Sequence, residues 1–229
     1  MWLLTQEGSV RGVVRASGVV AATAGFAEVG LIHLGRIYGS SPRERSLRLP
    51  GDEVIAAPKV QTDNAITIEA PPTRVWPWLV QMGWGRAGWY TARWVDKLLF
   101  PANGPSADRI IPELQDIAVG TFIPDGPPET ECGLYVIELV PERALVLRSN
   151  SHLPMSWRER ATLDWTWAFV LTPEDDGRRT RFHFRSRWVT EPWWWTTAGW
   201  LAIVPANFVM SRDMLRGVRQ RAEHFALTV

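Results

Sequence analysis

The sequence predicts an α+β fold in which a curved antiparallel sheet wraps around one long C-terminal helix, with an extra helix at the N-terminus. Two observations predict it. Beyond residue 120, apolar residues alternate with a period of two in short runs separated by turn residues. Residues 192–225 follow a helical period instead. The apolar face of the sheet needs a cover, and this last helix is the only long one available.

The first element is an apolar helix expected within residues 1–38. Residues 16–35 carry one formal charge, Glu28, and arginines flank both ends. This length is sufficient to cross a bilayer, although a carboxylate near the middle costs about 2.5–3.5 kcal/mol. Two interpretations stay open: the helix packs on its own domain or on a partner chain, or it enters a membrane.

Residues 39–61 are expected to form an irregular connector, because prolines and glycines interrupt every periodic pattern. The main domain, residues 62–229, then begins with a strand at 64–70. A helix at 73–82 and a short helix at 91–100 follow, and glycines break the chain between them.

The predicted strands that follow share alternating apolar residues and have turn residues at their ends. They cover residues 120–123, 134–139, 144–149, 163–171 and 180–189. A turn at residues 174–177 joins the last two as a hairpin. In the final helix, Pro205 is expected to kink or divide the first half. The apolar face of its second half contains Met210, Met214, Val218, Ala222 and Phe225.

Composition excludes several classes of function. The 25 basic and 24 acidic residues give a net charge of +1, so the chain lacks the basic excess with which proteins bind nucleic acid. The single cysteine, Cys132, allows neither an intramolecular disulfide nor a thiolate-rich metal site, and it fits a cytoplasmic location. No histidines have metal-ligand spacing, and no glycine loop follows a strand to hold a phosphate, so no metal or other cofactor is expected.

The strand at 180–189 has two chemically different faces. Arg181, His183, Arg185 and Arg187 alternate with Phe182, Phe184, Ser186 and Trp188. If the aromatic face points inward, which we favour, the basic face is a solvated outer surface. If the basic face points inward, it forms a pocket for a carboxylate or phosphate head group.

The 14 tryptophans are the most unusual feature of the composition. Large flat rings in such numbers build a core, a ligand pocket or a membrane-interface belt. The aromatic face of the strand at 163–171 is the natural wall of a cavity between sheet and helix. The candidate ligand-binding residues are Trp89, Tyr90, Trp165, Trp167, Phe169, Met210 and Met214.

Polar residues near such a cavity are the candidates for proton transfer. Asp108 and Arg109 either pair at the cavity mouth, where they would orient a polar ligand head, or form a structural salt bridge or helix cap, which we favour. Cys132 has no partner in the sequence, so nucleophilic catalysis is not expected. The candidate catalytic residues are Tyr90, Asp108, Arg109, Glu113 and His152.

Residues 192–210 carry no formal charge. A helix that is apolar all round is either buried or in contact with lipid. The first interpretation places this segment between the sheet and the N-terminal helix. The second places the indoles of residues 193–200 at a bilayer interface, together with residues 16–35.

Several motifs resemble a known superfamily. The stretch from Ala65 to Gly83 is similar to the opening of the SRPBCC superfamily, which has the helix-grip fold of START domains, pollen-allergen-like proteins and polyketide cyclases. The chain also resembles a largely uncharacterised bacterial branch of this superfamily. The segments that carry this resemblance are residues 49–53, 88–90, 106–115, 119–120, 143–148, 167–171, 180–181, 185–187 and 214–217. The resemblance covers about residues 40–225 and is specific for fold rather than activity. The tryptophan content exceeds what that branch leads us to expect.

The resemblance implies a small apolar partner, since members bind lipids, sterols, quinones or polyketides and only some catalyse a reaction. We therefore expect binding of a small hydrophobic or amphipathic molecule of the lipid, polyketide or quinone type in an aromatic-lined cavity. One alternative is an enzyme of the cyclase or dehydratase kind that uses polar cavity residues for proton transfer. Another is a membrane-attached accessory protein whose pocket has been filled by tryptophans.

Overall fold

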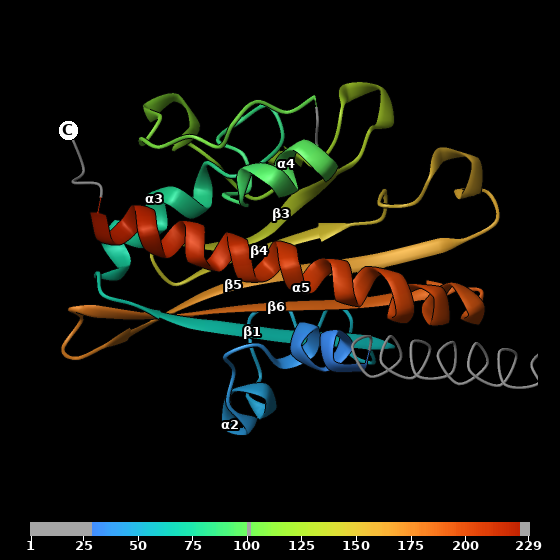
Figure 1. Ribbon diagram of the computed structural model, residues 1–229, viewed down its shortest axis with the longest axis horizontal. Coiled ribbons are helices and arrows are strands. Elements are labelled where there is room, and N and C mark those ends of the chain that lie inside the picture. The colour runs from blue at the N-terminus through green and yellow to red at the C-terminus, as the bar shows by residue number, and fades with distance from the viewer. Residues whose placement is uncertain (1–28, 100–101, 225–229) are drawn as a thin grey trace, which may run out of the picture.

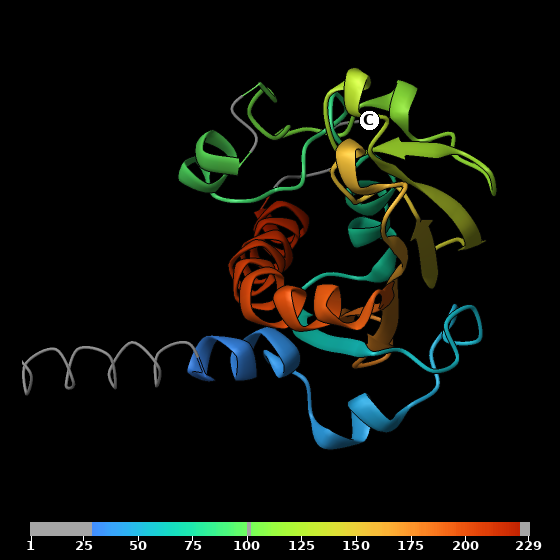
Figure 2. The ribbon, with the colours of Figure 1, turned by 90° about the vertical axis from the view of Figure 1, so that its right-hand side faces the viewer.

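The computed structural model describes residues 29–99 and 102–224 and has the predicted α+β fold (Figure 1). Six antiparallel strands form one sheet in the order β1-β6-β5-β4-β3-β2. The sheet is curved, and the long helix α5, Trp193–His224, lies along its inner face (Figure 2). This is the expected helix-grip arrangement.

The strands extend beyond several of their predicted ends. The strands are β1 Val60–Ile68, β2 Phe122–Pro124, β3 Gly133–Val140, β4 Ala144–Ser149, β5 Thr162–Glu174 and β6 Arg179–Glu191. β4 has its predicted bounds, whereas β5 and β6 are longer because their pairing continues to the hairpin end, where Glu174 faces Arg179. The turn between them places Asp175 and Asp176 at positive φ, which aspartate tolerates better than most residues.

The predicted helices appear in their predicted order, and α2, Pro42–Ser46, is an additional short helix within residues 39–61, which were expected to be irregular. The others are α3 Pro72–Val80, α4 Arg93–Leu99 and α5, with short 3₁₀ turns η1 Pro112–Leu114, η2 Pro128–Thr130 and η3 Met155–Trp157. Residues 29–37 are also helical. α5 continues through Pro205 as one helix, and its axis bends between the two halves (Figure 2).

The core lies between the inner face of the sheet and α5. Phe169 and Phe184 stack there with ring centroids 4.9 Å apart, and Leu215 and Val218 of α5 are fully buried. Each such large side chain contributes about 1.5–3 kcal/mol by leaving water. Strand β6 therefore points its aromatic face inward, as favoured above.

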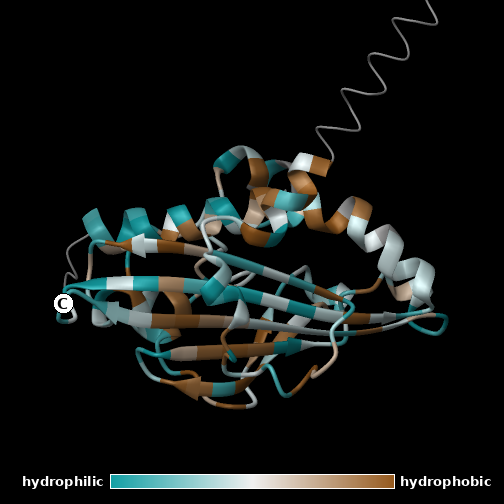
Figure 3. Cartoon of the chain, turned by 90° about the horizontal axis from the view of Figure 1, so that it is seen from below, coloured by the Kyte–Doolittle hydropathy of each residue, from teal (hydrophilic) through white to brown (hydrophobic). Residues whose placement is uncertain are grey.

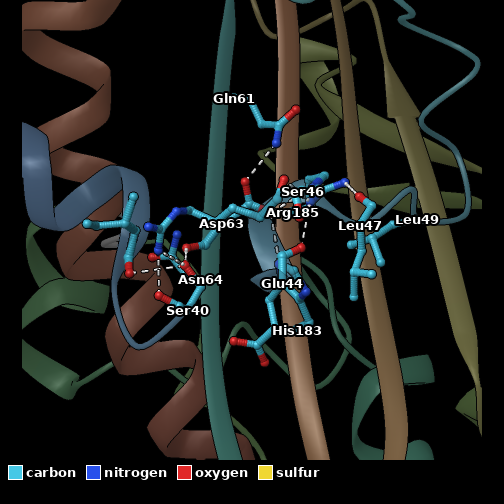
Figure 4. Close-up of polar contacts among 12 residues, drawn as sticks. Ser40, Glu44, Ser46, Leu47, Leu49, Gln61, Asp63, Asn64, His183 and Arg185 are labelled. Atoms are coloured by element: carbon cyan, nitrogen blue, oxygen red, sulfur yellow. Dashed lines mark hydrogen bonds and ion pairs between the residues drawn. The ribbon is translucent and has the colours of Figure 1, made fainter. Parts of the chain in front are cut away.

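The basic face of β6 points outward, but it is not the solvated surface that we predicted. His183, Arg185 and Arg187 are buried beneath residues 40–56. Arg185 Nε donates to Asp63 Oδ1 at 2.7 Å (Figure 4). Its Nη1 donates to Asp52 Oδ2 at 2.7 Å. The prediction was wrong because acidic side chains before and within β1 neutralise the arginines and bring a covering segment with them.

Two further contacts complete this network, which we call the outer network. His183 Nε2 lies 2.9 Å from Asp63 Oδ1, and Glu44 accepts from Arg181 Nε at 2.6 Å. Although burial alone would raise the pKa of Asp63, hydrogen bonds from His183, Gln61 and Arg185 lower it. The hydrogen bond from Arg181 lowers the pKa of Glu44 to about 2. Both carboxylates therefore stay ionised when covered.

No helix of the described residues is both long and apolar enough to cross a membrane. The segment at 16–35 lies mostly outside the described residues, and its part from residue 29 onward is helical. That helix packs on α5, where the guanidinium of Arg36 lies 4.9 Å from the ring centroid of Trp200.

Candidate functional site

The space between the sheet and α5 is almost filled. It retains a cavity of about 20 Å³, lined by Trp89, Thr91, Trp167, Phe184, Asn207, Met210, Ser211 and Met214. A volume of this size holds about one water molecule and no organic ligand. The expected ligand-sized cavity at this place is therefore absent, although four of the predicted ligand-binding residues surround the remaining space.

Aromatic rings fill this interior. Trp167 makes edge-to-face contacts with Trp89 at 5.4 Å and with Phe184 at 5.8 Å between centroids. Trp165 donates its indole N–H to Ser186 Oγ at 2.6 Å, and Phe169 is fully buried. These residues form a packed core, as interlocking rings do when no ligand separates them.

Tyr90 is part of a buried hydrogen-bond network. Its hydroxyl accepts from Gln81 Nε2 at 2.9 Å and donates to the carbonyl of Trp78 at 3.0 Å. Burial raises the pKa of Tyr90 far above its usual value. The phenol is therefore a neutral structural group that fixes α3 against residues 88–90.

Asp108, Arg109 and Glu113 lie exposed in the loop after α4. The backbone carbonyl of Arg109 accepts from Gln81 Nε2 at 3.1 Å. None of the three lines the pocket described next, so their predicted role in proton transfer gains no geometric support.

His152, the remaining candidate, borders a pocket of about 470 Å³, which we call the mouth pocket. The pocket lies at the end of the sheet where β2 and β4 end and β3 begins. Its lining residues are Trp84, Ala102, Asp125, Gly126, Pro127, Thr130, Cys132, His152, Leu153, Pro154, Met155 and Arg158. It is large enough for a small ligand, and His152 connects it with the predicted aromatic wall by contacting Trp165.

Both nitrogens of His152 are engaged. Nε2 lies 2.8 Å from Asp125 Oδ2, and Nδ1 lies 2.6 Å from Ser149 Oγ. Burial opposes protonation of the ring, but the interactions with Asp125 and Cys132 outweigh it and raise the pKa of His152 to about 9. The imidazole is therefore cationic at neutral pH and donates from both nitrogens. One face of the site is aromatic, since the ring meets Trp165 edge to face at 5.1 Å.

The strand ends explain why these groups meet. Asp125 follows β2, Cys132 precedes β3, and the backbone N–H of Asp125 donates to the carbonyl of Cys132 at 2.9 Å. Residues that face each other across an antiparallel pair point to the same side, so carboxylate and thiol both reach the ring. Ser149 ends β4, three residues before His152. Arg158 ties the two loops together by donating to the carbonyls of Thr130 and Ser151.

Sequence reasoning identified His152 but missed Asp125, Cys132 and Ser149. Residues 125–128 carried only a turn signal, and the pairing of β2 with β3 that brings Asp125 beside Cys132 is a long-range fact. Chemically, the group holds a fixed positive charge whose two N–H groups already donate to Asp125 and Ser149, so proton transfer to a ligand requires one of these hydrogen bonds to open. Within residues 29–99 and 102–224, no three His, Cys, Asp or Glu side chains are arranged to hold a metal ion.

A larger open groove of about 1420 Å³ continues from the mouth pocket around the β2–β3 end to the outer face of the sheet. Cys132, Leu153 and Arg158 line both spaces. In the groove, Arg148 makes a bidentate ion pair with Asp164 at 2.8 and 2.7 Å.

Comparisons with known proteins concern the fold alone. No family model matches the chain, and no curated protein matches it. A solved structure of a protein from Mesorhizobium loti is 16% identical, with a TM-score of 0.42, and covers 73% of this chain and 100% of that one. A hypothetical protein from Helicobacter pylori is 13% identical, with a TM-score of 0.46, covering 76% and 95%. Norcoclaurine synthase from Thalictrum flavum is 12% identical, with a TM-score of 0.39, covering 79% and 96%.

Proposed function

We propose that the chain, as a divergent relative of the SRPBCC superfamily, binds a small amphipathic molecule of the lipid, polyketide or quinone type in the mouth pocket. One observation carries the proposal: a pocket of about 470 Å³ combines an apolar wall with a buried acid–base pair, Asp125 and His152. Ligand sites typically combine mostly apolar walls with a few polar groups that fix orientation.

The walls supply the affinity. Trp84, Leu153 and Met155 present apolar surface to the pocket. Burial of about 400 Å² of ligand surface would contribute about 10 kcal/mol. Because association itself costs at least about 4 kcal/mol, at most about 6 kcal/mol remains, so we expect a Kd of about 40 μM or weaker.

The polar groups supply the orientation. Asp125 Oδ1 is buried and has no hydrogen-bond partner among the described residues. Solvent does not reach this atom, so a ligand hydroxyl would satisfy the acceptor only after a small shift of the pocket lining, which the need of buried polar groups for a partner favours. We therefore expect the polar end of the ligand near Asp125 and its apolar part along Leu153 and Met155.

Calorimetric titration with dodecanol, which carries a hydroxyl donor, and with a naphthoquinone tests the proposal. Met155, exposed at the pocket lip, is replaced in Met155→Lys, and the matched control Val119→Lys alters an equally exposed residue that lines neither space. We expect about tenfold weaker binding in the first variant only, since a charge replaces apolar contact. Failure of the wild type to bind either probe would refute amphiphile binding. Binding that Met155→Lys leaves intact but Met214→Trp abolishes would place the ligand under α5 instead.

The second candidate function is proton transfer by His152, as in a cyclase or dehydratase. The observation that favours it is a cationic imidazole held by Asp125 at 2.8 Å in a pocket wall. Once its hydrogen bond to Asp125 or Ser149 opens, such a group can protonate the carbonyl oxygen of a bound polyketone and so promote ring closure or loss of water. Incubation with an aromatic poly-β-ketone should give a cyclised or dehydrated product by mass spectrometry. His152→Gln should abolish it, and His224→Gln, at an exposed histidine, should retain it. Equal product in the two variants and in buffer would exclude this role.

A further inference from the structure

An exposed apolar face forms where the helix at residues 29–37 packs on the first half of α5. We call it the apolar face, and it consists of Val29, Leu31, Leu34, Trp193, Trp194 and Leu201. Trp193 is 72% exposed and Leu201 is 58% exposed. Trp194 and Leu201 are seven residues apart and so lie on one stripe of α5.

The helix at residues 29–37 packs directly on the first half of α5. Gly35 lies against Val204, and the ring of Tyr38 meets that of Phe208 at 5.7 Å. The helix at 29–37 and the adjacent part of α5 are coloured largely as hydrophobic in Figure 3. Large exposed apolar areas on a soluble domain mark interaction sites.

Charge narrows the choice of partner. Residues 29–37 and 193–211 contain no acidic residue, and Arg36 is their one formal charge. Indoles such as those of Trp193 and Trp194 prefer the boundary between lipid head groups and acyl chains, and basic side chains favour anionic lipids. A surface that binds another protein would need neither exposed indoles nor basic side chains without acidic ones.

The sequence of residues 1–28, which lie outside the described residues, also favours a lipid partner. Residues 1–28 directly precede this helix, and residues 16–27 carry no formal charge, with Arg11 and Arg15 before them. The apolar face is therefore the place where an uncharged stretch joins the domain.

We propose that the apolar face docks onto the surface of a lipid bilayer that contains anionic lipids, with the indoles of Trp193 and Trp194 at the head-group level. Docking is peripheral, and it does not depend on the ligand-binding function proposed above. It brings the first turns of α5 to the membrane, and Trp157, which follows the mouth-pocket residue Met155, contacts Trp194 edge to face at 5.7 Å. The mouth pocket thereby lies near a source of apolar ligand.

Flotation of the full chain with vesicles tests the proposal. The vesicles are phosphatidylcholine with phosphatidylglycerol, or phosphatidylcholine alone. Wild type should float, more with the anionic vesicles. Combined Trp193→Ser, Trp194→Ser and Leu201→Ser should lower the partition coefficient about tenfold, because binding scales with buried apolar area. The matched control Trp94→Ser, at an exposed tryptophan of α4, should float like wild type.

A local probe separates the apolar face from residues 1–28. In a Cys132→Ser chain, an NBD label at Leu201→Cys should shift to the blue with anionic vesicles, and a label at Trp94→Cys should not. Three results would overturn the proposal. They are a combined variant that floats as well as wild type, an NBD emission at position 201 that does not shift in protein that floats, and a wild type that does not bind vesicles at all. Concentration-dependent dimerisation of that last protein would identify a second copy as the partner.

Discussion

Replacing His152 with asparagine should remove a pH-dependent part of the stability of the fold. The pKa of His152 rises from 6.5 to about 9 in the folded chain. One pH unit of pKa corresponds to about 1.36 kcal/mol, so protonation stabilises the folded state by about 3 kcal/mol. The side chain is 11% exposed, which leaves little screening by solvent.

The sign follows from the direction of the pKa change. A histidine whose pKa is raised on folding stabilises fully below its unfolded pKa, and the contribution is lost as the pH rises through the folded pKa. The stabilisation is therefore complete below about pH 6.5 and gone above about pH 9.

Urea unfolding at about pH 6 and about pH 9.5 measures the effect. Wild type should lose about 3 kcal/mol more of its unfolding free energy between the two conditions than His152→Asn does. His224→Asn, which alters an exposed histidine, serves as the control. Equal losses in wild type and His152→Asn would refute the reasoning, as would an imidazole that titrates near 6.5 by NMR.

Other substitutions test the rest of the structure. Glu44→Gln should weaken the outer network above about pH 4.5 and flatten the acid unfolding curve. The reason is that the ionised Glu44 side chain stabilises the fold above that pH, and this stabilisation is lost as the pH falls towards about 2. An unchanged midpoint of acid unfolding would contradict this. Phe169→Ala should cost about 3–5 kcal/mol by thermal unfolding, since its ring is fully buried between Trp167 and Phe184. Gly217→Ala should cost about 1–3 kcal/mol, because the new Cβ would clash with the backbone carbonyl oxygen of Tyr90; a melting temperature like that of wild type would show that α5 can shift there.

Local periodicity was sufficient to predict the fold. Alternation along β5 predicted the strand and its inward aromatic face, because a period of two places every second side chain on the same face. The short helix α2 was missed although Ser41 and Glu44 form a capping box, with Glu44 N donating to Ser41 Oγ at 3.2 Å. The S-x-x-E spacing of that box was readable in the sequence.

Two features could not follow from local patterns. The covering of the basic face depends on Asp52 and Asp63 meeting Arg185 across more than a hundred residues. The acid–base group depends on loops that meet only when β2, β3 and β4 pair. Periodicity assigns a residue to a face, but it cannot say what another segment places over that face.

The tryptophans connect the filled interior with the position of the pocket. An indole buries about 150–250 Å², which is comparable to a substantial part of a small ligand. Trp89 and Trp167 therefore occupy the space that a ligand would take under α5, and only about 20 Å³ remains. The same wall, through Trp165 and Trp167, meets the ring of His152 at 5.1 and 6.3 Å. Trp165 and Trp167 therefore do two things: they help to fill the interior under α5, and they support the His152 imidazole in the wall of the mouth pocket.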